Sequence, residues 1–176
     1  GIDMQNKQIR VAFLSTYPPR ECGLATFTQD LVQKLQEIPD ITSQVVAISN
    51  EDIAYEEPVF LTLQQHERSD YSEMAKKLNQ SGCDLLVIEH EYGIYGGKSG
   101  EYLLSLIEAL TIPFVTTLHT VLSRPNRLQK KIIHLLGLRG QKIITMATNS
   151  AVILEDTYGV EPCKIAVIPH GVPNIS

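Results

Sequence analysis

The sequence contains few cysteines and no long hydrophobic run. Its three cysteines, Cys22, Cys83 and Cys163, lie far apart and form no C-x-x-C pair. Neither a disulfide framework nor a zinc site is therefore expected, and a reducing compartment is favoured. No apolar stretch approaches the roughly 20 residues that span a bilayer, and no signal-peptide hydrophobic region is present. These absences predict a cytoplasmic protein without a membrane-spanning segment.

The sequence also lacks an excess of basic residues. The 15 lysines and arginines are outnumbered by 20 aspartates and glutamates, which gives a net charge of −5. Broad nucleic-acid binding requires a basic surface, so we expect no nucleic-acid partner. The length of 176 residues, with 43% hydrophobic and 20% charged residues, is typical of one soluble domain with a buried core.

Several common catalytic signatures are missing. The loop after the first predicted strand has neither the G-x-G-x-x-G dinucleotide fingerprint nor the G-x-x-x-x-G-K-[ST] phosphate loop. No H-x-H or H-E-x-x-H spacing links His90, Glu91, His119 and His170, so a metal site built from them is disfavoured. A serine hydrolase is disfavoured too, because no G-x-S-x-G elbow occurs.

The sequence does have a regular alternation of short apolar runs and amphipathic segments. The apolar runs predict strands buried on both faces, and the segments between them carry apolar residues at helical spacing. Strands are expected at 9–15, 43–49, 56–63, 83–90, 113–119, 142–148 and 164–169, and helices at 26–38, 71–82, 101–110, 127–138 and 150–159. Gly82 is expected to cap the second helix, and Ser150 and Gly159 the last one. This alternation predicts an α/β, Rossmann-like, doubly wound and mostly parallel sheet with helices on both faces.

The ends of the chain are set apart from this domain. Residues 1–3 precede Met4 and look like a cloning scar. Residues 4–170 are expected to form the domain, and residues 171–176 continue a Pro-, Gly- and Asn-containing tail that resembles the start of a linker.

Unusual residues gather directly after the predicted strands, where open parallel sheets bind ligands. Gly23 follows the first strand at a helix start, where free N–H groups favour an anion, although a plain turn is the alternative. The glycine-rich segment 90–100 suits an anion or sugar hydroxyls, or is simply a structured loop in which Glu91 satisfies backbone donors. His119 ends its strand and could bind a hydroxyl or transfer a proton, although a lone histidine is more often structural.

The segment 124–139 combines five basic residues with apolar ones. They are Arg124, Arg127, Lys130, Lys131 and Arg139. A helix that covers the sheet and exposes a solvated basic face is the favoured interpretation. Peripheral contact with the inner face of a membrane is the alternative.

Four motifs, taken in order, resemble the N-terminal domain of family 4 retaining glycosyltransferases, which have the two-domain GT-B fold. They are STYPPRECGLATFTQDL, HEYGIYGG, TTLHT and VIPHGV, and the resemblance covers residues 9–173. The resemblance implies the acceptor-binding half of an enzyme that transfers a sugar from a UDP- or GDP-linked donor. The acceptor would be a hydroxyl of a glycan, a lipid or a small molecule. The resemblance implies no metal cofactor, in agreement with the missing D-x-D motif.

The resemblance also implies roles for individual residues. Gly23 and Leu24 would lie near the donor phosphates and the reacting sugar, and His119 would face the transferred sugar and stabilise its developing positive charge. The acceptor side would comprise Glu91, Tyr92, Gly93, Gly96, Gly97 and Thr120. His170 and Gly171 match the hinge toward a second domain. That domain carries most donor contacts in the family, so the chain alone is expected to fold but to be inactive.

Two other functions stay open from the sequence. One is half of a nucleotide-binding oxidoreductase, for which Glu51 and Asp52 would supply the acidic residues after the second strand. The other is a sugar-binding module without catalytic activity.

Overall fold

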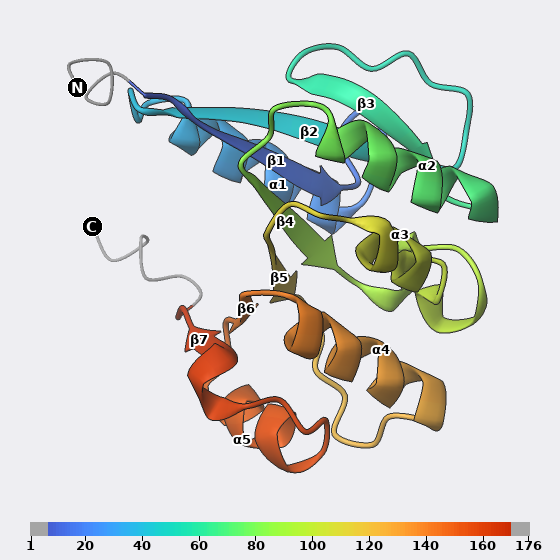
Figure 1. Ribbon diagram of the computed structural model, residues 1–176, viewed down its shortest axis with the longest axis vertical. Helices are drawn as coiled ribbons and strands as arrows, with labels where there is room; N and C mark the ends of the chain where they lie inside the picture. The colour runs from blue at the N-terminus through green and yellow to red at the C-terminus, as the bar shows by residue number, and fades with distance from the viewer. Residues whose placement is uncertain (1–6, 170–176) are drawn as a thin grey trace.

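Seven parallel strands form the centre of the computed structural model, which describes residues 7–169 (Figure 1). Their order across the sheet is β3-β2-β1-β4-β5-β6-β7. The strands are β1 (Ile9–Ser15), β2 (Ile41–Ser49), β3 (Val59–Gln64), β4 (Leu85–His90), β5 (Phe114–Leu118), β6 (Lys142–Thr145) and β7 (Ile165–Val167). The helices are α1 (Gly23–Leu35), α2 (Arg68–Asn79), α3 (Leu103–Ala109), α4 (Arg127–Arg139) and α5 (Thr148–Asp156). The predicted Rossmann-like α/β fold is confirmed.

Helices cover both faces of the sheet because the crossovers run in two directions. The β1–α1–β2 crossover moves one way along the sheet, and the crossovers that contain α2, α3 and α4 move the other way. Right-handed connections therefore place α1 opposite α2, α3 and α4 (Figure 1). On the α1 face, Phe13 and Val45 pack in one cluster with Val32 of the helix. On the other face, Leu14 and Leu86 belong to the larger core.

The order of β1 and β4 creates the switch point of the sheet. The two strands are neighbours, with Phe13 opposite Val87, while their following connections diverge. Crevices at the carboxyl ends of such strands are the usual ligand sites of open α/β sheets.

Some predicted helix ends were wrong. The sequence placed Ser150 as the cap of the last helix, but α5 begins at Thr148 after the N-cap Ala147, and Ser150 is buried inside it. Similarly, α2 ends at Asn79 with Gln80 as its C-cap, and Gly82 (φ +81°) instead turns the chain toward β4. Apolar spacing locates the buried face of a helix, whereas its ends depend on local hydrogen bonds.

The basic segment 124–139 covers the sheet, as the favoured interpretation predicted. In α4, Ile132, Ile133 and Leu136 are buried while Lys130 and Lys131 are exposed. Within residues 7–169, no helix has both the length and the apolar character needed to span a membrane. Membrane contact through the exposed face of α4 stays a prediction.

Candidate functional site

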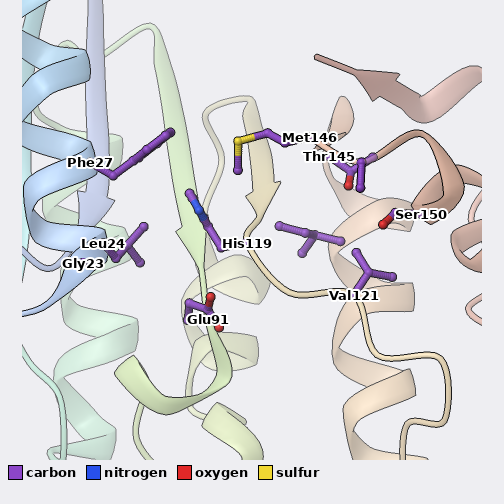
Figure 2. Close-up of a pocket in the computed structure, with 11 residues that line it drawn as sticks. Gly23, Leu24, Phe27, Glu91, His119, Val121, Thr145, Met146 and Ser150 are labelled. Atoms are coloured by element: carbon purple, nitrogen blue, oxygen red, sulfur yellow. The ribbon is translucent and has the colours of Figure 1, made fainter. Parts of the chain in front are cut away.

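A pocket of about 560 Å³ opens at the carboxyl edge of the sheet (Figure 2). It is lined by Gly23, Leu24, Phe27, Glu91, Leu118, His119, Val121, Thr145, Met146, Ala147 and Ser150. These residues come from the ends of β5 and β6 and from the segments that follow β1, β4, β5 and β6. The parallel topology therefore gathers residues that follow four different strands, as expected from the sequence. His170 and Gly171, the predicted hinge residues, lie outside the described residues.

The start of α1 forms one wall of the pocket. Cys22 is the N-cap of the helix, and its Sγ accepts a hydrogen bond from the backbone N–H of Ala25 at 3.4 Å. Gly23 and Leu24 occupy the first helical positions, where N–H groups have no acceptor within the helix. A Cβ at Gly23 would have no atom within 4 Å. The wall is thus open, and its N–H groups suit an anionic group.

His119 lies between the α1 residues and those of β6 and α5 (Figure 2). It directly follows β5, and its backbone N–H donates to the carbonyl of His90 at 3.1 Å. The ring meets Phe27 edge-on, with centroids 4.8 Å apart and planes at 81°. Its side chain is 12% exposed. The imidazole is thus fixed against α1 while part of it remains accessible from the pocket.

The ring of His119 also contacts a buried carboxylate that the sequence prediction missed. Nε2 lies 2.7 Å from Oε1 of Glu89, whose side chain is only 1% exposed. Glu89 stands inside the apolar run Leu85–His90 of β4, so it was interpreted as part of a strand. A useful signal was present, because an acidic residue in a strand buried on both faces needs a partner.

Glu91, which lines the pocket, is in contact with Thr120, which does not line it. The Thr120 hydroxyl lies 3.0 Å from each oxygen of the Glu91 carboxylate and donates its single hydrogen to them. Glu91 itself lines the pocket beside His119. The structure therefore brings together two residues expected on the acceptor side, and the contact orients a hydrogen-bond acceptor next to His119.

The remaining residues of the predicted acceptor side do not line this pocket. Gly93 accepts a hydrogen bond from the Gln65 side chain at 3.1 Å, and the Gly96 N–H donates to the Tyr71 hydroxyl at 2.9 Å. These bonds attach the glycine-rich segment to the β3 and α2 side of the sheet. Tyr92 is half-buried, and Gly97 is exposed. An acceptor-binding role for Tyr92, Gly93, Gly96 and Gly97 stays a prediction.

His90 lies apart from the pocket, in the core. It is wholly buried, with its ring stacked on Tyr95 and edge-on to Tyr92. Burial, followed by the proximity of His119, lowers the pKa of His90 to about 3, so the ring is neutral near pH 7. Within the described part of the chain, no group of three or more His, Cys, Asp or Glu could hold a metal ion.

The fold and sequence resemble those of known proteins. Residues 22–174 match the family described as Glycosyltransferase Family 4. The structure is similar to the apo form of the lipopolysaccharide outer core galactosyltransferase WaaB, with a TM-score of 0.63, 10% identity, and coverage of 92% of this chain and 45% of that chain. It is also similar to a glycosyltransferase from Rickettsia africae ESF-5, with a TM-score of 0.62 and 18% identity. That match covers 95% of this chain and 44% of that chain.

The chain spans less than half the length of these two solved structures. A search of curated proteins found no match.

Proposed function

The chain belongs to glycosyltransferase family 4, and from this premise we propose that it forms the acceptor-binding half of a retaining sugar transferase. The donor is a UDP- or GDP-linked hexose, and the acceptor is a hydroxyl of a glycan, a lipid or a small molecule. A second domain supplies most of the donor contacts, so this half is inactive alone. The convergence of the α1 N-terminus, His119 and Glu91 on one pocket is the observation that carries the proposal.

Each wall of the pocket suits one part of the reaction. The N–H groups of Gly23 and Leu24 can receive a phosphate oxygen of the donor. His119 can hydrogen-bond the transferred sugar, and this contact stabilises positive charge that develops at its anomeric carbon. The Glu91 carboxylate, oriented by Thr120, can accept a hydrogen bond from the attacking hydroxyl. Together these contacts would hold donor and acceptor close enough to react.

No metal is required in this proposal, because the pocket offers helix N–H groups to the phosphates. A cytoplasmic location agrees with the three free cysteines. Family membership favours this function over the nucleotide-binding oxidoreductase that the acidic pair after β2 had left open.

The proposal can be tested by a donor screen on the full-length natural protein. UDP- and GDP-linked hexoses are incubated with it, with and without simple glycoside acceptors, and release of free UDP or GDP is measured. We expect one nucleotide to be released, faster with an acceptor, and without added metal. Calorimetry with NAD serves as the contrast. Tight NAD binding without turnover of any nucleotide sugar would overturn the proposal.

A further inference from the structure

Glu89 is an unusual residue for the middle of a parallel sheet. It is completely buried, and it lies on β4 opposite Thr117 of β5. Burial of a carboxylate costs several kcal/mol unless the charge is paired and hydrogen-bonded. Among residues 7–169, its side chain has one hydrogen-bond partner, His119, and its Oε2 atom has none. Because burial of the Glu89 carboxylate is costly and the carboxylate contacts a residue of the pocket, we expect Glu89 to do more than fill space in the core.

The contact determines which ring nitrogen of His119 carries a hydrogen. A carboxylate oxygen accepts hydrogen bonds, so the nitrogen 2.7 Å away, Nε2, is the donor. Nδ1 makes no hydrogen bond to the described residues and is not among their buried, unpartnered polar atoms. Nδ1 is therefore the nitrogen that a ligand can reach. In the neutral ring with hydrogen on Nε2, it bears a lone pair and accepts a hydrogen bond.

We propose that Glu89 is the positioning residue of His119 and holds its imidazole in the Nε2–H form, with Nδ1 as an acceptor for a sugar hydroxyl. The functional part of this inference rests on the proposed sugar transfer. The opposite tautomer would turn an N–H, with its positive end, toward the pocket. Such a dipole would oppose the positive charge that develops on the sugar, whereas a lone pair favours it.

Two other contacts hold the ring in the same orientation. The edge-on contact with Phe27 fixes the plane of the imidazole from the α1 side. The bond from the His119 N–H to the His90 carbonyl fixes the backbone. Neither contact discriminates between the two tautomers, because neither involves a ring nitrogen. The choice of tautomer thus depends on Glu89.

The tautomer can be measured directly in this chain by nitrogen-15 NMR of the histidine rings. Two-bond proton–nitrogen correlations at pH about 9, above the ordinary histidine pKa of about 6.5, report which nitrogen is protonated. His134 is an internal reference with the opposite expectation, since its Nδ1 lies 3.0 Å from the Tyr158 carbonyl, which can only accept. We expect His119 with hydrogen on Nε2 and His134 with hydrogen on Nδ1.

Two substitutions separate positioning from simple packing. Glu89→Gln keeps an acceptor oxygen, so His119 should keep the Nε2–H form. Glu89→Leu removes it, so His119 should become a mixture of tautomers while His134 stays unchanged and reports an intact fold. If Glu89→Leu does not fold, the wild-type and Glu89→Gln spectra still show which ring nitrogen of His119 carries the hydrogen. Hydrogen on Nδ1 of His119 in wild type, or an unchanged His119 in a folded Glu89→Leu, would overturn the inference.

Activity gives the second readout, in the full-length protein with the nucleotide sugar found in the screen. Glu89→Leu should lower kcat about 10- to 100-fold with the donor KM within about threefold, and Glu89→Gln should recover most of the loss. Equal losses in both variants would contradict positioning through an acceptor oxygen. If no nucleotide sugar is turned over even by wild type, the proposed function fails, while the NMR result still decides whether Glu89 sets the tautomer.

Discussion

Glu89 and His90 are adjacent on β4, but it is the side chain of Glu89 that hydrogen-bonds a residue lining the pocket. Side chains alternate between the faces of a strand, so Glu89 reaches His119 while His90 faces the core with Tyr95. The sequence could not rank these two residues, because it shows a carboxylate and an imidazole side by side at a strand end. It did place His119, Gly23 and Glu91 at the carboxyl edge of the sheet, because each lies in a segment that follows a strand. Which of the two neighbours faces the site depends on the strand's orientation in the sheet.

The buried His90 should make stability depend on pH. Its pKa in the folded protein is about 3, against about 6.5 when unfolded, so only the unfolded chain binds a proton between these values. Its contribution to stability is complete above pH 6.5 and is lost as the pH falls toward 3. Substitution His90→Phe keeps an aromatic ring and removes the titration. Between pH 7 and pH 5 the variant should lose about 2 kcal/mol less unfolding free energy than wild type.

Urea unfolding at the two pH values measures this difference. His66→Phe is the matched control, because His66 is exposed. An equal pH dependence of His90→Phe and wild type would show that His90 does not titrate as its burial requires.

Substitution by alanine should lower the free energy of unfolding at Gly96 but leave it almost unchanged at Gly23. A Cβ at Gly96 would collide with the Gln65 carbonyl and the Tyr102 ring, so Gly96→Ala should cost about 1 to 3 kcal/mol of unfolding free energy. A Cβ at Gly23 meets open space, so Gly23→Ala should change stability by less than about 0.5 kcal/mol. It should instead raise the donor KM, because the methyl group enters the pocket wall. A destabilised Gly23→Ala with an unchanged KM would place Gly23 outside the binding surface.

At the scale of elements, hydrogen bonds at the start of α4 and just after α5 hold the loop between β5 and α4. The side chain of Asn126 accepts from the Gln129 N–H at 2.8 Å, and the Gln129 side chain accepts from the Asn126 N–H at 2.9 Å. The Tyr158 hydroxyl, just after α5, donates to the Leu122 carbonyl at 2.7 Å. These bonds leave the segment between β5 and α4 little freedom and thereby fix the wall formed by Val121.

Removal of this capping box should weaken α4 in a measurable way. Asn126→Ala leaves the Gln129 N–H without its acceptor and should cost about 1 kcal/mol of unfolding free energy. Asn149→Ala is a suitable control, since Asn149 is exposed in the first turn of α5 and does not cap it. Chemical unfolding of both variants provides the comparison, and equal stabilities would mean that packing alone holds α4.

The elements were predicted well where a buried face determines them. β1 was predicted at its observed bounds, 9–15, because the run IRVAFLS is almost continuously apolar. α1 was placed at 26–38 but begins at Gly23. The reason is Cys22, whose thiol caps the helix although cysteine is not among the preferred N-cap residues. Contacts of this kind depend on the folded backbone and leave no periodic signal.

At the scale of the whole molecule, the alternation of strands and helices predicted the parallel sheet, and the sheet explains the pocket. Parallel strands deliver their carboxyl ends to one edge, so Gly23, Glu91 and His119 meet although 96 residue positions separate the first from the last. The glycine-rich segment at the same edge was expected to join them. Its hydrogen bonds to Gln65 and Tyr71 hold it on the β3 and α2 side of the sheet, away from the pocket. The order of strands along the chain does not predict such bonds.

The most direct test of the proposed site compares donor turnover by His119→Gln and His134→Gln in the full-length protein. His119→Gln removes the imidazole but keeps an N–H for Glu89, which avoids leaving a buried carboxylate unpaired. His134 is an exposed histidine on α4 outside the pocket. We expect kcat to fall about 100-fold or more for His119→Gln, with His134→Gln within about twofold of wild type. Near-normal turnover by a folded His119→Gln would contradict the proposed site.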